Sequence, residues 1–382
     1  MLRAGYGINT NAESYRNNVQ TYPEVISASY TGANTYTAAG SLVTGIPALI
    51  GPNLNANSVP LPPNYQTWIY KTPYSRGYAE SYNVTVQHDF GRGLNVQVGY
   101  VGTRDVRPSG GVNINAAGPN GGKAGQPYYI LYGNASTFSE MYPIDASKYN
   151  SLQARAAKRF STGNIGVAYT FSKAMDATDN DEGGSLTWNW GPIMYRNYAL
   201  AGFDRTHNFQ TYGTYSLPFG KGHQMLSHGI GAILAGGWQV NWILSRESGT
   251  PFTVGASGTS LNSPGNTQTA NQVLPTVAIL GGHGPGNPYF DINAFAAVTT
   301  PTFGNAGRNI LRGPGLFSLN SGIFRTFRIN ERFNLQLRAE ALGLTNTPIF
   351  GNPSATVGSS SIGIISSSSG ERQIRLALKL RF

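Results

Sequence analysis

The chain has 382 residues, of which only 12% are charged, with no cysteine and a net charge of +10. Soluble domains carry about 25% charged residues, so this shortage indicates that much of the surface does not face water. No run of roughly 18 apolar residues occurs, which excludes a transmembrane helix. Lysine and arginine are spread singly, which argues against nucleic-acid binding and favours contacts with a lumen or with lipid phosphates.

Segments in which apolar and polar residues alternate recur along the chain, and this period of two is typical of β-strands. They lie at residues 2–7, 82–90, 94–103, 149–160, 165–176, 207–219, 237–248, 316–328, 333–345 and 372–382. The segment 316–328 alternates imperfectly, because Ser321 and Arg325 share a face with apolar residues. We therefore expect a β-bulge in that segment.

The last segment, residues 372–382, has the strictest alternation: one face is wholly apolar and the other carries three cations. A transmembrane β-barrel strand requires this pattern, because lipid lies on one side and water on the other. About eleven residues are also enough for a tilted strand to cross a bilayer. We expect Leu376, Leu378, Leu380 and Phe382 to form a signal for the barrel-assembly machinery. The alternative is an edge strand of a soluble sheet.

The connections between these segments alternate in length. The short ones lie near 91–93, 161–164 and 329–332, and the long ones near 8–77, 104–148, 177–206, 249–315 and 346–371. Outer-membrane barrels have short periplasmic turns and long external loops, whereas compact soluble domains rarely hold several long loops. The connection 220–236 fits less well, being long and containing a possible helical turn at 225–234. The predicted fold is all-β: an antiparallel transmembrane β-barrel segment of about ten strands.

The polar faces of these strands supply candidate residues for the wall of a lumen. They are Arg155, Arg159, Arg338, Glu340, Arg375, Lys379 and Arg381. We expect most of them to pair with one another rather than to contact a ligand. Lys158 falls on the lipid side near a short turn, where its amine could reach the headgroups.

The loop 177–206 begins with acidic residues that could attract Ca²⁺, a cation that prefers flexible sites rich in oxygen. These residues are Asp176, Asp179, Asp181 and Glu182. Their spacing departs from the EF-hand pattern, because Gly183 stands where a ligand is needed. We expect a solvated acidic loop and no bound metal.

The same loop carries four aromatic residues, Trp188, Trp190, Tyr195 and Tyr198. Exposed aromatic side chains could stack on a sugar or peptide ligand outside the membrane. They could equally pack the loop against its neighbours, which is the arrangement that we favour.

Catalytic patterns are missing from the sequence. The five histidines are scattered and none has metal-binding spacing, and the serines lack a nucleophile elbow. The glycine-rich stretch 281–286 contains a proline and predicts a flexible loop rather than a phosphate-binding one. We expect no enzymatic activity and no cofactor.

Several short motifs occur in an order that resembles the Oar-like TonB-dependent outer-membrane receptors. They are Leu2-Arg3-Ala4-Gly5-Tyr6-Gly7-Ile8, Phe171-Ser172-Lys173, Leu217-Pro218-Phe219-Gly220-Lys221-Gly222, Gly236-Gly237-Trp238, Ser248-Gly249-Thr250-Pro251-Phe252, Phe303-Gly304-Asn305-Ala306-Gly307-Arg308-Asn309, Arg312-Gly313-Pro314-Gly315, Arg338-Ala339-Glu340-Ala341, Leu344-Thr345-Asn346, Phe350-Gly351-Asn352-Pro353 and Leu380-Arg381-Phe382. Each motif is weak alone, and the shared order over nearly the whole chain makes the resemblance specific.

The resemblance implies a bacterial outer-membrane receptor that takes up an unidentified external ligand with energy from the TonB complex. Such receptors are similar in plan: signal peptide, carboxypeptidase-regulatory-like domain, plug and 22-stranded barrel. Residues 1–382 would form one C-terminal portion of the barrel, without the signal peptide and plug. The implied partners are outer-membrane lipid, the barrel-assembly machinery, an unknown ligand and the TonB complex through the missing plug.

Two other functions remain open. One is a structural or adhesive outer-membrane barrel that anchors external loops without transport. The other is a secreted, soluble all-β binding module, which would need no detergent and would have no lipid-facing belt.

Overall fold

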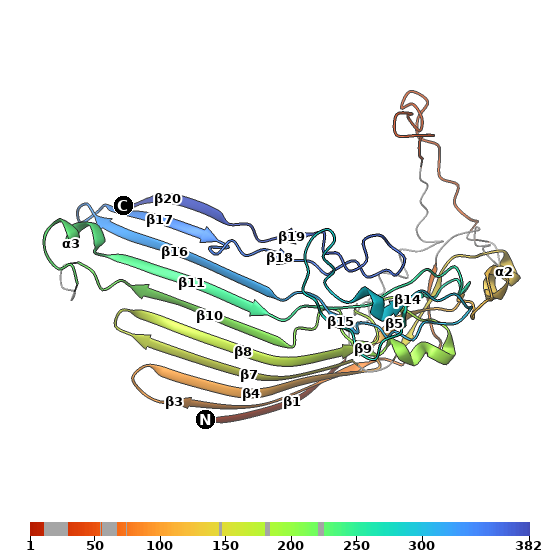
Figure 1. Ribbon diagram of the computed structural model, residues 1–382, viewed down its shortest axis with the longest axis horizontal. Helices are drawn as coiled ribbons and strands as arrows, with labels where there is room; N and C mark the ends of the chain where they lie inside the picture. The colour runs from red at the N-terminus through yellow and green to blue at the C-terminus, as the bar shows by residue number, and fades with distance from the viewer. Residues whose placement is uncertain are drawn as a thin grey trace.

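A computed structural model describes residues 1–10, 30–53, 55, 67–73, 75–144, 147–179, 184–220 and 225–382. Its main feature is one large antiparallel sheet with the strand order β1-β3-β4-β7-β8-β10-β11-β16-β17-β20 (Figure 1). The strands are β1 (Leu2–Thr10), β3 (Tyr78–Asp89), β4 (Leu94–Val106), β7 (Ser147–Phe160), β8 (Gly163–Asp176), β10 (His207–Ser216), β11 (Trp238–Glu247), β16 (Leu316–Arg328), β17 (Asn334–Leu342) and β20 (Gln373–Arg381). All ten predicted strands are confirmed. Among the described residues the sheet is not closed, because β1 and β20 each pair with one neighbour.

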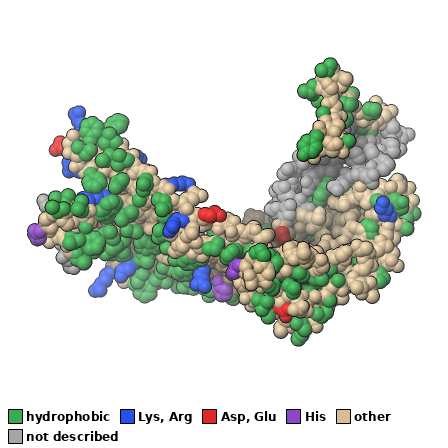
Figure 2. Space-filling view, turned by 45° about the horizontal axis from the view of Figure 1, so that its top comes forward, with side chains coloured by type: hydrophobic (Ala, Val, Ile, Leu, Met, Phe, Trp, Pro, Cys, Tyr) green, Lys and Arg blue, Asp and Glu red, His purple; other side chains and the backbone are tan. Residues whose placement is uncertain are grey.

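The pairing register divides the side chains of this sheet between two faces. One row crosses six strands through Val96, Ala156, Val167, Thr211, Leu244 and Leu319. Paired residues point to the same side of a sheet, so such rows form one largely apolar face. This face exposes large side chains, among them Leu376, which is 77% exposed. Figure 2 shows hydrophobic side chains over much of the visible sheet, as a lipid-facing surface requires.

The connections confirm the predicted alternation of lengths. Short ones, at 90–93, 161–162 and 329–333, lie together at one end of the sheet (Figure 1). The described parts of the long ones, at 11–77, 107–146, 177–206, 248–315 and 343–372, lie at the other end. The exceptional connection 217–237 contains α3 (Gly229–Ala235), which confirms the predicted helical turn. None of the helices in the described ranges is long and apolar enough to span a membrane.

The long loops contain small elements of their own. The sheet β2-β6-β5 is built from β2 (Thr67–Tyr70), β6 (Phe138–Pro143) and β5 (Ser109–Asn113). Short pairs join β12 (Pro251–Phe252) to β15 (Leu311–Arg312), β13 (Asn271–Gln272) to β14 (Phe295–Ala296), and β18 (Ile349–Phe350) to β19 (Ser368–Ser369). In addition, β9 (Ala199–Leu200) pairs antiparallel with the end of β8. The helices are η1 (Lys123–Gly125), α2 (Pro127–Tyr132), η2 (Gly191–Asn197) and η3 (Ile292–Ala294). The loops therefore form a folded layer, which we call the external layer.

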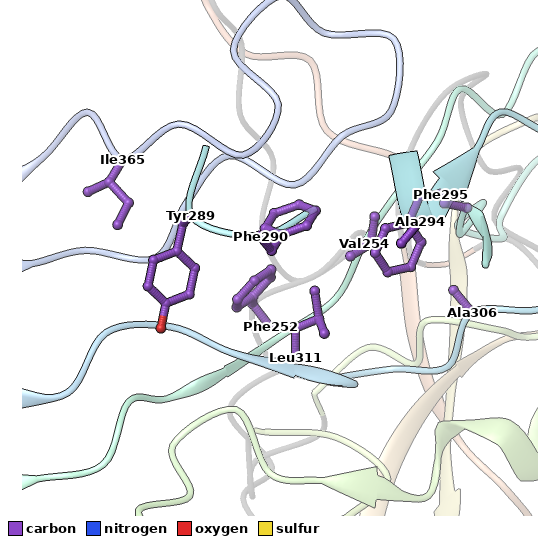
Figure 3. Packing of buried hydrophobic residues seen from close by; sticks show 10 residues of the cluster. Phe252, Val254, Tyr289, Phe290, Ala294, Phe295, Ala306, Leu311 and Ile365 are labelled. Atoms are coloured by element: carbon purple, nitrogen blue, oxygen red, sulfur yellow. The ribbon is translucent and has the colours of Figure 1, made fainter. Parts of the chain in front are cut away.

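The main hydrophobic core of the described residues lies in this layer and not against the sheet (Figure 3). Its centre is Phe290, which is fully buried and lies 5.9 Å, between ring centroids, from both Phe252 and Phe295. Val254, Leu311 and other buried residues surround these rings. The strands turn their apolar side chains outward, so the loops are where apolar groups can pack away from water.

The predicted bulge in β16 is wrong. The strand pairs with β11 and β17 residue by residue through Ser321 and Arg325. Arg325 instead stands on the apolar face near a short turn, where its guanidinium donates to the Leu234 carbonyl at 2.9 Å. It also lies 4.4 Å from the ring centroid of Phe327. A cation at the membrane boundary can reach polar partners in this way, so no bulge is needed.

We predict that Phe290→Ala destabilises the external layer by about 3–5 kcal/mol, the cost of emptying a packed aromatic site. Cleavage of the external loops by added protease, followed on outer membranes, should accelerate strongly. Tyr195→Ala, which removes a ring that is 75% exposed, is the control and should leave the cleavage rate nearly unchanged. Equal protection in both variants would contradict the assignment of this core.

Candidate functional site

A buried arginine joins two of the long loops in the external layer. Arg308, in the loop 248–315, makes an ion pair with Asp176 at the end of β8. Its guanidinium also lies 3.3 Å from the Asp179 carboxylate and donates to the Asn197 carbonyl at 2.9 Å. The side chain of Arg308 is only 6% exposed. Because a buried cation is costly unless paired and hydrogen-bonded, these contacts hold the two loops in one arrangement.

Two more arginines strengthen the same junction. Arg312 makes an ion pair with the buried Asp204 and donates to the Gly249 carbonyl at 3.0 Å. Arg196, in η2, donates to the carbonyls of Gly304 and Ala306 at 2.9 and 2.8 Å. Burial lowers the pKa of the Arg196 guanidinium. The Arg312–Asp204 pair and both Arg196 hydrogen bonds link the loop 177–206 to the loop 248–315, whereas the contact with Gly249 lies within the loop 248–315.

Asparagines connect a third loop, 107–146. The amide of Asn266 donates to the Ala117 carbonyl at 2.9 Å, and its oxygen accepts from the backbone N–H of Asn189 at 2.7 Å. The oxygen of Asn189 accepts from the backbone N–H of Asn113 at 2.8 Å. Loops from three different hairpins therefore form one platform at the external end of the sheet.

The four predicted ligand-loop aromatics have different surroundings. Trp188 is fully buried beneath the Arg196 guanidinium, which lies 4.5 Å from its ring centroid, so it cannot stack on an external ligand. Trp190 stacks on Phe303 at 5.8 Å between ring centroids. For these two, packing within the external layer is the observed role: Trp188 packs against Arg196 of its own loop, and Trp190 packs against the loop 248–315. Tyr195 and Tyr198 line a cavity of about 260 Å³ and stay candidates for ligand contact.

The predicted acidic cluster does not offer a set of free carboxylates. Asp176 and Asp179 both contact Arg308, and Asp179 also accepts from the backbone N–H of Gly202 at 2.5 Å. An arginine thus stands where the Ca²⁺ hypothesis places the metal. Asp181 and Glu182 lie outside the described residues. Within the described ranges, no group of three or more acidic, histidine or cysteine residues could hold a metal ion.

The seven predicted lumen residues all lie on the polar face that the register defines, but in two separate groups. Arg155 and Arg159 are on β7, and the other five are on β17 and β20, which lie five and six strand spacings of about 4.8 Å away. Those five are Arg338, Glu340, Arg375, Lys379 and Arg381. Arg338 pairs with Glu340 at 3.6 Å, and Glu340 stands opposite Arg375 in the register. Arg155 instead donates to the Tyr212 hydroxyl at 3.0 Å, so mutual pairing is not general.

Between these two groups the polar face holds a groove of about 520 Å³. Asn164, Asn241, Asn320, Tyr212 and Glu340 contribute to its lining. These amide, hydroxyl and carboxylate groups can donate and accept hydrogen bonds, which suits contact with a polar solute. Except for Glu340, single-sequence reasoning missed them, although each occupies a polar position of an alternating strand.

The predicted assembly signal lies on the outermost strand, β20. Leu376, Leu378 and Leu380 stand opposite Ala339, Leu337 and Leu335 of β17, so all three belong to the apolar face. Phe382 follows the last strand residue and is exposed. This placement leaves the strand's apolar side chains and its free edge accessible together.

We predict that Arg308→Ala disorders the junction of the external loops, because it leaves Asp176 buried without its counterion at a cost of about 3–5 kcal/mol. Protease cleavage in the loops 177–206 and 248–315 is the measurement. Arg104→Ala removes a half-exposed arginine paired with Glu80 at 3.9 Å and should cost at most about 1 kcal/mol. Intact protection in Arg308→Ala would show that the junction does not depend on this ion pair.

We predict that deleting Leu380, Arg381 and Phe382 abolishes insertion of the protein into the outer membrane. The deletion removes the terminal aromatic residue and the pairs that Leu380 and Arg381 make with β17. The amount of heat-modifiable protein in purified outer membranes is the measurement. Lys379→Gln changes the polar face of the same strand and should insert normally.

Comparison with known proteins identifies the family of this chain. Residues 1–375 match the family described as outer membrane beta barrel domain. A search of curated proteins finds no match. Among solved structures, the outer-membrane transporter YddB from Escherichia coli aligns with a TM-score of 0.48 and 10% identity over 84% of this chain and 34% of that one.

Two further solved structures are similar at the same low level. The ferric-catecholate import receptor Fiu from E. coli K12 has a TM-score of 0.41 and 9% identity over 100% of this chain and 33% of that one. The ferripyoverdine receptor from Pseudomonas aeruginosa has a TM-score of 0.40 and 8% identity over 80% and 27%. The chain thus spans about a third or less of these proteins. The match over residues 1–375 shows that the chain belongs to the outer membrane β-barrel domain family, located in the bacterial outer membrane.

Proposed function

We propose that the chain forms part of the wall and the external layer of a TonB-dependent receptor of the Oar-like type, which takes up a substrate actively. The main support for this proposal is that the sheet of the described residues is not closed. In hydrocarbon the free backbone groups of β1 and β20 have no partners, and each unpaired group costs several kcal/mol. Pairing with further strands of a larger barrel removes that cost.

The polar face supports a role in passage of a solute. Its groove offers asparagine and tyrosine side chains in the wall, and the platform of joined loops stands at the external end of the same strands. A ligand would meet the loops first and the wall afterwards. Plug movement and contact with the TonB complex would belong to another part of the receptor, and no catalytic step is included.

The competing arrangement is a self-contained barrel in which β1 pairs with β20, serving as a structural or adhesive anchor. An even number of strands permits such closure, since β1 and β20 would then meet in antiparallel orientation. The two arrangements differ in one checkable contact, the distance between these edge strands.

We predict that cysteines placed on β1 and β20 do not cross-link in the native protein. The chain has no cysteine of its own, so Ala4→Cys can be combined in turn with Ile374→Cys, Leu376→Cys and Leu378→Cys. Ala4→Cys with Val84→Cys, a directly paired position on β3, is the positive control. The mass of the native product in outer membranes should also lie far above 40.8 kDa.

An efficient β1–β20 disulfide together with a product near 40.8 kDa would establish the self-contained barrel and overturn the proposal. Recovery of the protein only in soluble fractions would contradict the membrane assignment itself.

A further inference from the structure

A large cavity lies beside the apolar, membrane-facing side of the sheet. Its volume is about 1260 Å³, and it is bounded by β8, β10, β11, β16 and the loop 248–315. Phe209, Arg246 and Phe317 form one cross-strand row of that face. Tyr169 stands opposite Phe209, and Leu244 lies two residues from Arg246 on the same face. The wall of the cavity is therefore mainly aromatic and aliphatic.

The loop side of the cavity is also apolar. Ile279 and Tyr289 line it, and Leu280, which follows Ile279 in the chain, is exposed. The strands end here in long loops, so the cavity lies at the external boundary of the membrane. Exposed apolar side chains at this level can contact the acyl region of the external leaflet.

Charge distinguishes this cavity from an ordinary hydrophobic gap. Arg246 is exposed and has no ion pair or hydrogen bond among the described residues. The other charged lining groups are engaged: Glu247 pairs with Arg205 at 3.5 Å, and Arg312 pairs with Asp204. His207 contributes an imidazole whose Nδ1 is hydrogen-bonded to the Tyr169 hydroxyl at 2.8 Å. The cavity thus combines an uncompensated cation with a polar ring.

We propose that this cavity binds one anionic phospholipid of the external leaflet. The lipid phosphate pairs with Arg246 and accepts a hydrogen bond from His207, while an acyl chain lies along Phe209, Leu244 and Phe317. An unpaired cation on a membrane-facing surface is costly, and a lipid phosphate supplies the counterion at the depth where Arg246 stands. The proposal depends on the membrane location and not on active uptake.

The test uses the full protein, purified from outer membranes in mild detergent and stripped of lipid. Native mass spectrometry then measures retention of phosphatidylglycerol, which is anionic, and of phosphatidylcholine with the same acyl chains, which has no net charge. Phosphatidylglycerol should be retained in preference. Arg246→Gln should weaken its retention about fivefold, the effect of one arginine near a lipid surface, and leave phosphatidylcholine unchanged.

Arg155→Gln is the matched control, because it removes an exposed arginine from the opposite face of the sheet. It should retain phosphatidylglycerol like the unaltered protein, and heat modifiability would confirm that both variants are folded. Equal retention of the two lipids, or no effect of Arg246→Gln, would overturn the proposal. Displacement of phosphatidylglycerol by millimolar inorganic phosphate would assign the site to a small anion instead, which also overturns it.

Discussion

Backbone hydrogen bonding in hydrocarbon is the constraint on which the rest of this structure depends. A strand that crosses a bilayer has no water to pair with, so its N–H and C=O groups must bond to neighbouring strands. An unbroken antiparallel path from β1 to β20 meets this requirement for the eight strands between the edges. The same pairing determines which side chains lie on each face of the sheet, because paired residues point to the same side. A register shift by one residue would turn the lipid-facing side chains of a strand toward the lumen.

As a consequence, the main hydrophobic core of the described residues is formed by the loops and not by the sheet. Phe290 and its neighbours pack there, while the strands present leucine and valine to lipid. The loops are polar over much of their length, so buried charges and amides complete the layer. Arg308 and Asn266 each bond to groups from other loops, which makes the position of one loop depend on the next. A platform held in this way can present a constant surface to a ligand.

Cations on the membrane-facing side stand at both ends of the strands and not in the middle. Arg325 lies at the short-turn end, where its guanidinium donates a hydrogen bond to the Leu234 carbonyl and lies over the ring of Phe327. Arg246 lies at the external end beside a large cavity. The depth of each residue explains the difference. Beside Arg325, the connection 217–237 supplies a carbonyl, and beside Arg246 the external membrane boundary offers lipid phosphate.

Strand positions, the division into two faces and the alternation of loop lengths were determined by the sequence alone, since a period of two is a local property that every strand displays. Residues 372–382 are the clearest case, and β20 confirms them. The tertiary structure alone decided the partners of the buried polar groups. Arg308 meets Asp176 across 132 residues, and Trp190 stacks on Phe303 of another loop. Neither contact leaves a local periodicity, because only the packing of several loops brings these side chains together.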